Sequence, residues 1–215
     1  MKKNIALCIL FVCIFFAGKA QQKNIEYGFQ AGVNINSAAG KGAFKNIGAT
    51  TGLHAGGHFK IQMTKHFGLK ALLAYDQNGW VYGALVFENS NSTGFDYGDV
   101  INKLNYINLP LVAEYSCGKK IRFYLDGGVF TGYLFSTKEI KKISSPVAYT
   151  QDVTGTQRSS ANFGISAGTG VQVPLAHNIK LDFGVRDNLG LVNTDNSAIK
   201  TNAFSIVTGL TFTLR

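Results

Sequence analysis

The strict alternation of apolar and polar side chains between residues 106 and 135 constrains the fold more than any other feature of the sequence. This stretch contains two alternating runs, residues 106–115 and 121–135, which are separated by a short polar turn. A two-residue period places alternate side chains on opposite faces of a β-strand, so the stretch predicts a β-hairpin with one apolar face. Each run is roughly twice the usual strand length of about 5–6 residues, which suits tilted strands that cross a bilayer.

The first 20 residues have the parts of an export signal. Lys2 and Lys3 give a positive start, residues 5–17 form an apolar run, and Gly18 and Ala20 are small residues at the positions that a signal peptidase reads. The apolar run has the length of a signal-peptide core and is too short for a spanning helix. We therefore expect a signal peptide at residues 1–20 and one outer-membrane barrel domain at residues 21–215.

Two alternatives for this segment are a retained anchor helix and a lipoprotein anchored through Cys8 or Cys13. Cleavage would remove both of these cysteines and three lysines, which would lower the formal net charge from +9 to +6. Cys117 would then be the one cysteine left, in a predicted turn. The sequence therefore predicts neither an internal disulfide nor a cluster of thiolate metal ligands in the mature chain.

The two-residue period recurs along the rest of the chain and predicts eight strands. The connections between them alternate strictly between a few residues and long segments. Short turns on one side and long loops on the other are typical of outer-membrane barrels, and an even strand count places both termini at the periplasmic side. The predicted strands are residues 27–35, 52–62, 67–78, 106–115, 121–135, 162–173, 179–191 and 203–214, and the predicted long loops are residues 36–51, 81–102, 136–160 and 192–200.

Alternation alone does not say which face points inward, and a soluble lipocalin-like barrel would place its apolar face inside. Three features favour a membrane barrel. The polar faces are rich in glycine and in charges of both signs, and only 15% of the chain is charged, which is low for a soluble surface. The export signal excludes the cytoplasm, and aromatic residues that could form interfacial girdles lie near the strand ends: Tyr27, Phe67, Tyr75, Tyr115, Phe123, Tyr133 and Phe135.

The fold class is therefore an all-β, eight-stranded antiparallel up-and-down transmembrane β-barrel. The lumen of such a barrel is narrow enough for side chains to fill it, and unpaired charges there would be costly. We interpret the inward ionisable residues as a salt-bridge network that closes the lumen, with a narrow ion path or a small-ligand site as alternatives. These residues are Lys60, Lys70, Asp76, Glu114, Arg122, Asp126, Lys180, Asp182 and Arg186.

Two motifs suggest chemistry but have simpler explanations. Residues 164–168 match the G-x-S-x-G nucleophile elbow, yet they lie inside an alternating strand with no helix behind it, and the elbow needs a strand-to-helix turn. His54 and His58 point the same way, but four residues along a strand span roughly 13 Å, too far to share a metal. We predict no catalytic, metal or cofactor site and no enzyme.

The long loops contain five lysines: Lys41, Lys45, Lys138, Lys141 and Lys142. A basic external loop could bind phosphate groups of lipopolysaccharide, and the alternative is solvated loop charge without a partner. No platform of aromatic and basic residues predicts nucleic-acid binding. The expected surroundings are outer-membrane lipid and lipopolysaccharide, with other envelope or secretion proteins as further candidate partners of a monomer.

Several segments in order resemble the outer-membrane β-barrel domain family of Bacteroidetes, which includes PorT-like proteins. They are EYGFQAGVNI, GLHAGG, LLAYDQNG, YINLPLVAEY and DFGVRDNLGLVN, and together they cover the mature chain. The resemblance implies an eight-stranded barrel, and its PorT-like branch implies a link to type IX secretion and gliding. Leu72 stands where the family commonly has an inward acidic residue, and Glu114 where it has a basic one.

The sequence thus predicts a non-enzymatic barrel of a Gram-negative outer membrane that serves as a structural or docking element through its long loops. The alternatives are a PorT-like accessory of protein secretion, a narrow channel or small-ligand binder, and a barrel-embedded lipid enzyme. The last would need Ser, His and an acid clustered at one rim, a pattern the sequence does not suggest.

Overall fold

The computed structural model describes residues 25–39, 47–88, 95–143, 149–154, 159–194 and 199–214. The predicted signal peptide lies outside these residues. Among the described residues, no helix is long and apolar enough to cross a membrane. The strands are β1 (Ile25–Ala39), β2 (Ile47–Gly48), β3 (Thr50–Gln62), β4 (Phe67–Glu88), β5 (Phe95–Cys117), β6 (Arg122–Ile143), β7 (Tyr149–Thr154), β8 (Ala161–Ala176), β9 (Ile179–Gly190) and β10 (Lys200–Leu214).

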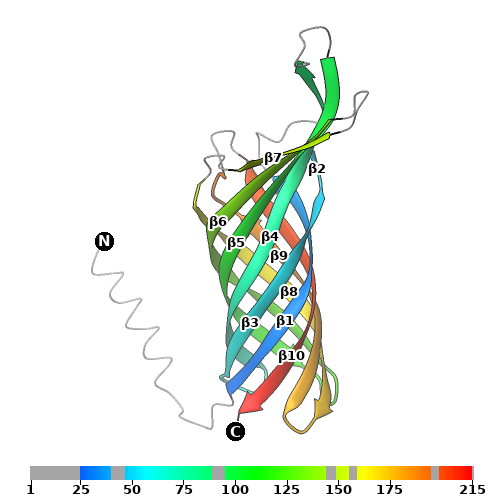
Figure 1. Cartoon of the computed structure of the whole chain (residues 1–215). Coiled ribbons are helices and arrows are strands. Elements are labelled where there is room, and N and C mark those ends of the chain that lie inside the picture. The colour runs from blue at the N-terminus through cyan, green and yellow to red at the C-terminus, as the bar shows by residue number, and fades with distance from the viewer. Residues whose placement is uncertain are drawn as a thin grey trace, which may run out of the picture.

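Eight of the described strands, all except β2 and β7, pair in antiparallel orientation and close into a barrel. The closing ladder joins β1 to β10 along the whole of β1, from Ile25 opposite Leu214 to Ala39 opposite Lys200. Figure 1 shows the tilted strands winding around one axis, with β1 beside β10. The predicted eight-stranded up-and-down barrel is confirmed, and its closure leaves no open strand edge along the wall.

One end of the barrel, here called the turn end, carries three short connections at residues 63–66, 118–121 and 177–178. Gly118 has a φ of 116°, a backbone conformation that favours glycine, and it allows the tight reversal between β5 and β6. The described chain also begins and ends here, at Ile25 and Leu214. The long connections lie at the opposite end, here called the rim end.

The outer wall of the barrel is apolar and the inner wall is polar. Phe29 is 66% exposed and Leu125 63% exposed on the outside, whereas Lys60 and Glu114 are each only 2% exposed on the inside. A lipocalin-like soluble barrel would show the reverse arrangement, so that alternative is wrong.

Aromatic side chains gather near both ends of the outer wall. At the turn end, the rings of Phe67 and Tyr115 lie 5.1 Å apart between centroids, and Tyr27 stacks on Phe212 at 5.4 Å. Near the rim end, the ring centroids of Tyr75 and Phe135 are 6.0 Å apart. Aromatic residues at two levels are the arrangement expected at the two membrane interfaces.

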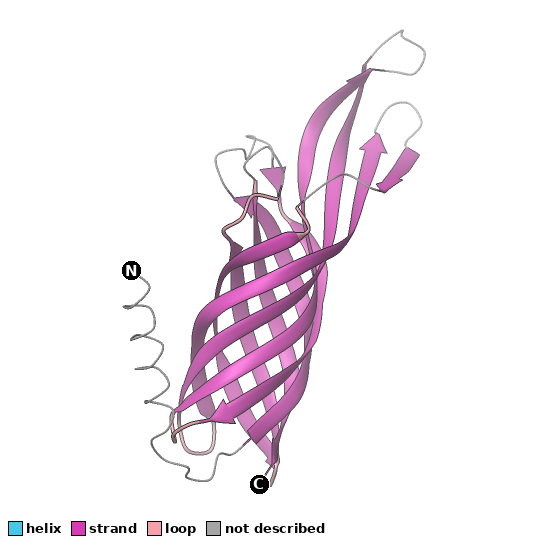
Figure 2. Cartoon of the chain, turned by 90° about the vertical axis from the view of Figure 1, so that its left-hand side faces the viewer, coloured by secondary structure: helices cyan, strands magenta, loops and turns pink. Residues whose placement is uncertain are grey.

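The prediction of long loops at residues 81–102 and 136–160 is wrong in part, because much of each segment is strand. β4 continues to Glu88, β5 begins at Phe95, β6 continues to Ile143, and β7 pairs with the end of β6. Five described segments therefore form a sheet that extends beyond the barrel, here called the rim sheet: β2, residues 80–88 of β4, residues 95–104 of β5, residues 137–143 of β6, and β7. Figure 2 shows β4 and β5 running well past the barrel mouth.

The strands extend for a physical reason. The buried positions continue upward at every second residue of β5, with Val100, Asn102 and Leu104 facing Trp80 and Tyr82 of β4. The backbone hydrogen bonds between the two arms of a hairpin do not require a bilayer, so the strands can stay paired where they extend beyond the membrane. The ladder shifts register between Tyr82 and Leu85, where the strands leave the barrel.

The outer wall predicts a depth-dependent response to charge. We expect Leu73→Arg, in the middle of the barrel part of β4, to lower the free energy of unfolding in phospholipid vesicles by about 2–4 kcal/mol. The matched variant Phe67→Arg, at the turn end of the same strand, should lower it by only about 0–1 kcal/mol. Guanidinium titration of both variants measures the difference, and equal losses would contradict the lipid-facing assignment of this wall.

Candidate functional site

Lys60 lies at the centre of an ion cluster in the half of the lumen near the turn end. Its Nζ is 2.6 Å from Glu26 Oε2 and 2.8 Å from Glu114 Oε1. Lys70 Nζ lies 3.5 Å from Glu114 Oε2, and Lys180 Nζ contacts Glu26 Oε1. These five residues, here called the lysine–glutamate cluster, come from five different strands.

The strand register explains why these residues meet. Glu26 is directly opposite Lys60 across β1 and β3, and Lys60 is opposite Lys70 across β3 and β4. Two ammonium groups side by side would repel each other, so the carboxylates that flank them are needed to balance their charge. The cluster thereby ties together strands that are up to 154 residues apart in the chain.

A second ion pair lies on the inner faces of β6 and β9. Arg186 Nη2 donates to Asp126 Oδ2 at 2.8 Å, and both residues are buried. Tyr124, two residues before Asp126 on β6, is also buried, and its ring centroid lies 5.3 Å from Lys70 Nζ, a cation–π distance. A Cβ at Gly184 would come within 2.1 Å of Tyr124 Oη, so glycine at that position makes room for the tyrosine.

A third group surrounds Asp76 in the middle of the lumen. His54 Nδ1 is 2.6 Å from Asp76 Oδ1, and Gln30 Nε2 is 2.7 Å from His54 Nε2. Because the Gln30 amide donates to Nε2, the ring hydrogen lies on Nδ1, where Asp76 accepts it. Asn34 and Asn108 also donate to this carboxylate, at 3.0 and 2.7 Å. Asp76 is therefore held by three donors while it is fully buried.

The lumen near the rim end is filled by apolar side chains instead. Trp80, Leu104, Tyr106, Leu134 and Ile199 pack into one buried cluster, here called the apolar cap. Ile199 precedes β10, while the other four come from β4, β5 and β6. The alternation in the sequence indicates an inward position for three of these residues. Trp80 lies an even number of residues from Asp76 on β4, and Leu104 and Tyr106 lie an even number from Glu114 on β5.

The nine ionisable residues predicted to face inward do not form one network. Asp76 belongs to the histidine group, Asp126 and Arg186 pair with each other, and Asp182 accepts a hydrogen bond from Thr211. Arg122 lies at the turn end, where it donates to Ser116 Oγ at 2.6 Å and to the Lys65 carbonyl oxygen at 2.9 Å. The remaining four are Lys60, Lys70, Glu114 and Lys180 of the lysine–glutamate cluster.

Sequence reasoning missed Glu26, which binds two lysines of that cluster. Glu26 lies two residues before Gly28 and four before Gln30, which both face inward, so the alternation could have placed it on the inner face. It also missed the amides of Asn34 and Asn108, because neutral side chains on a polar face do not stand out in a sequence.

The motif residues have structural roles. Ser166 is buried within β8, where no helix follows among the described residues. A Cβ at Gly164 would lie 2.5 Å from Phe130, and one at Gly168 would lie 2.8 Å from Asp126, so both glycines make room for lumen side chains. His58 binds Thr211 Oγ1 at 3.0 Å and shares no ligand position with His54.

The structure places the remaining predicted features as follows. Cys117 is an exposed free cysteine at the end of β5. Within the described part of the chain, no three His, Cys, Asp or Glu side chains are placed to hold a metal ion. Lys41 and Lys45 lie outside the described residues.

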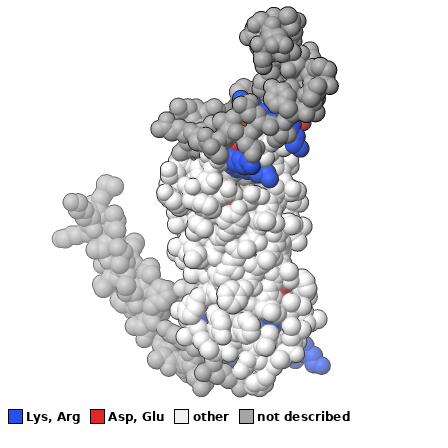
Figure 3. All heavy atoms as spheres, viewed as in Figure 1, with Lys and Arg blue, Asp and Glu red and all other residues white. Residues whose placement is uncertain are grey.

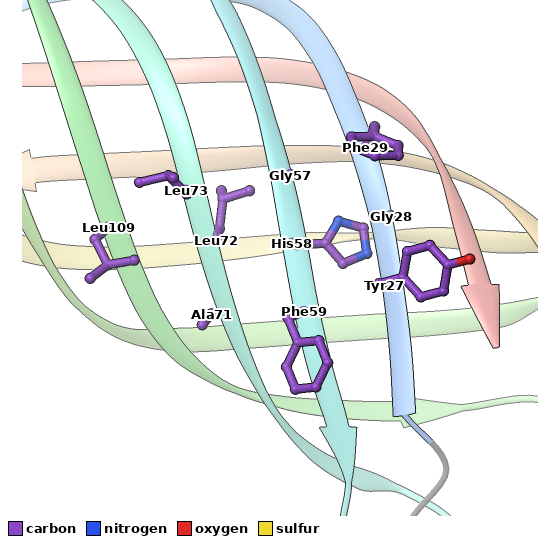
Figure 4. Close-up of a pocket in the computed structure, with 10 residues that line it drawn as sticks. All are labelled: Tyr27, Gly28, Phe29, Gly57, His58, Phe59, Ala71, Leu72, Leu73 and Leu109. Atoms are coloured by element: carbon purple, nitrogen blue, oxygen red, sulfur yellow. The ribbon is translucent and has the colours of Figure 1, made fainter. Parts of the chain in front are cut away.

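The outer wall carries a shallow apolar depression of about 430 Å³ centred on Gly57. Figure 4 shows Tyr27, Phe29 and Phe59 around Gly57, with Leu73 and Leu109 on the adjoining strands. The depression exists because glycine and Ala71 leave space among larger side chains. Its position on the outer wall makes it a surface for acyl chains.

Chemically, the lumen is a set of paired charges and buried amides beneath an apolar cap. Paired charges of this kind stabilise one arrangement of strands, since breaking one pair leaves a buried charge without compensation. Three of the described histidines, His54, His58 and His66, make hydrogen bonds, with His66 Nδ1 lying 2.9 Å from the Ser116 carbonyl oxygen. His177 is exposed in the turn after β8.

Comparison with known proteins agrees with this geometry. Residues 19–196 match the family model for an outer membrane protein beta-barrel domain. No curated protein sequence matches the chain.

Among solved structures, the attachment invasion locus protein Ail of Yersinia pestis is 14% identical, with 87% of this chain and 98% of that chain covered and a TM-score of 0.42. Neisserial surface protein A is 13% identical, with 86% and 96% covered and a TM-score of 0.44. The outer membrane protein OprG from Pseudomonas aeruginosa is 13% identical, with 90% and 96% covered and a TM-score of 0.45.

The lysine–glutamate cluster predicts a large effect of removing its central cation. We expect Lys60→Met to lower the free energy of unfolding by about 3–5 kcal/mol, because the two buried carboxylates lose the cation that lies between them. Adding Glu26→Gln and Glu114→Gln to that variant should lower it further, because Lys70 and Lys180 then lose their carboxylates. Lys119→Met, at an exposed site in a turn, is the control and should change stability by less than about 0.5 kcal/mol.

Guanidinium titration in lipid vesicles measures the free energy of unfolding of all of these variants. A Lys60→Met protein as stable as the Lys119→Met control would show that the cluster does not hold the strands together.

Proposed function

We propose that this chain, which belongs to the outer membrane protein beta-barrel domain family, is a non-enzymatic and non-conducting barrel that presents its rim sheet as a structural or docking element. The protein is an outer-membrane barrel, and the proposal concerns what it does there. The observation that carries the proposal is the filled lumen: ion pairs near the turn end, amides and a His–Asp pair in the middle, and the apolar cap near the rim end.

The proposed orientation places the turn end in the periplasm and the rim sheet outside the cell. Short turns at one end and long connections at the other support it, because bacterial outer-membrane barrels have short periplasmic turns and longer external loops. On this orientation both termini of the mature chain are periplasmic, and the rim sheet is the part of the protein that meets the surroundings of the cell.

A docking role is supported by the form of the rim sheet. Five described segments hold it together through backbone pairing, so it offers a firmer surface than isolated loops would. A non-enzymatic role is supported by the state of the candidate groups, because His54 and His58 are engaged in hydrogen bonds and Ser166 is buried in a strand.

A PorT-like accessory of type IX secretion and gliding is the second candidate. The observation that favours it is the resemblance of segments such as YINLPLVAEY, residues 106–115, to the family that includes the PorT-like proteins. If this role holds, deletion of the gene should abolish export of secreted substrates and colony spreading, and the intact gene should restore both. Normal secretion and spreading in the deletion strain would leave the structural or docking role.

The filled lumen predicts that the protein does not conduct ions. We expect the purified protein in planar bilayers to give no discrete conductance steps. A variant with Tyr124→Gly and Phe130→Gly that also carries Trp80→Gly and Tyr106→Gly should conduct, because these side chains fill the lumen against facing glycines and in the apolar cap. A gel-mobility difference between unheated and heated samples verifies that both proteins are folded. Discrete steps from the unmodified protein would favour the narrow-channel alternative.

A further inference from the structure

Lysines gather on the outer wall where the barrel meets the rim sheet. On β5, Val100, Asn102 and Leu104 are buried inside, so the alternate residue Lys103 lies on the outer side. Lys138 of β6 is the register partner of Lys103, and Lys142 is the partner of Asp99. Figure 3 shows lysine and arginine atoms at this level, above a wall that is otherwise almost free of charge.

The side chains on this wall change character in order of height. The ring centroids of Tyr75 and Phe135 lie 6.0 Å apart near the top of the apolar wall. Tyr75 Oη donates to Asn105 Oδ1 at 2.9 Å, which is the next level up. Lys103 follows Asn105 on the same face, two residues further along β5. Apolar, aromatic, amide and cationic levels therefore succeed one another from the middle of the wall to the rim sheet.

This order matches the outer leaflet of a Gram-negative outer membrane on the proposed orientation. Aromatic side chains settle at the boundary between acyl chains and headgroups. The headgroup of lipopolysaccharide is a phosphorylated sugar, whose hydroxyl groups hydrogen-bond with amides and whose phosphates attract ammonium groups. Lysines directly above an aromatic level are therefore at the height of those phosphates.

The register adds a second argument. Lys103 and Lys138 are directly opposite each other on one face, so their Cβ atoms are about 5 Å apart and one phosphate group can reach both ammonium groups. Asp99 is on the same face, four residues from Lys103 along β5, and it is opposite Lys142. Glu139, which lies 3.9 Å from Lys141, is on the opposite face of the sheet.

We propose that Lys103, Lys138 and Lys142, here called the rim lysines, bind the phosphate groups of lipopolysaccharide on the outer wall of the barrel. The inference rests on the proposed orientation and names a partner for that end of the protein. Continuity with the apolar wall favours a lipid over a soluble polyanion, because the acyl chains of the same molecule would lie against Tyr75 and Phe135. The site thereby fixes the height of the barrel in the leaflet.

The chain provides a matched control at the other end of the same hairpin. Lys119 and Lys120 are exposed in the turn between β5 and β6, so they carry equal charge at the opposite side of the membrane. The test variant is Lys103→Gln with Lys138→Gln and Lys142→Gln, and the control is Lys119→Gln with Lys120→Gln. Loss of the turn lysines should leave lipopolysaccharide binding unchanged.

The experiment measures binding of purified rough-type lipopolysaccharide to the full-length folded protein in detergent, by co-purification and native mass spectrometry. We expect the triple variant to bind at least about tenfold more weakly than the unmodified protein, since each surface lysine contributes a factor of a few. Enzymatically dephosphorylated lipopolysaccharide should show a similar loss with the unmodified protein. Equal binding by the triple variant, equal binding of the dephosphorylated form, or equal binding of phosphatidylglycerol would overturn the inference.

A labelling experiment separates this inference from the proposed orientation. In a Cys117→Ser background, Lys142→Cys should react with a membrane-impermeant maleimide on intact cells, and Lys119→Cys should not. If Lys142→Cys is labelled and the triple variant still binds like the unmodified protein, only the lipopolysaccharide site fails. If Lys142→Cys is protected on intact cells, the orientation fails and the site fails with it.

Discussion

The hydrogen-bonded ladder between β1 and β10 is the constraint on which the rest of the structure depends. Once these strands pair, every strand of the barrel has two neighbours, and the backbone of the wall can enter a bilayer without unsatisfied polar groups. Closure also turns the two-residue alternation into two separate surfaces. One set of side chains then meets lipid, and the other set must share a confined interior.

Eight strands enclose so little space that the interior has to be filled by complementary side chains. Large residues and glycines face each other, as Tyr124 faces Gly184 and Phe130 faces Gly164. Charges are placed so that cations and carboxylates alternate, as Lys60 does between Glu26 and Glu114. The packing of the lumen therefore selects the strand register, in the way that a hydrophobic core selects the register of a soluble sheet.

The alternation was enough to predict the number of strands, their antiparallel order and the inward side of Lys60, Glu114 and Arg186. It was not enough to predict the partners. The alternation assigns a residue to the inner or the outer face. The tilt of the strands decides which residues of distant strands lie at the same height in the lumen, and the sequence does not give that tilt. For this reason Glu26 and the amides around Asp76 were missed. The rim sheet was missed because the run that begins with Val81 was assigned to a loop, although the strand continues past the length that a bilayer needs.

The apolar cap isolates the two ends of the lumen from each other. At physiological ionic strength, mobile ions screen exposed charges over about 8 Å and screen buried pairs much less, because they cannot approach them. Trp80, Leu104 and Ile199 are buried above the ion pairs and close that approach from the rim end. The cap therefore helps to preserve the attraction that holds the strands together when the concentration of salt outside the barrel rises.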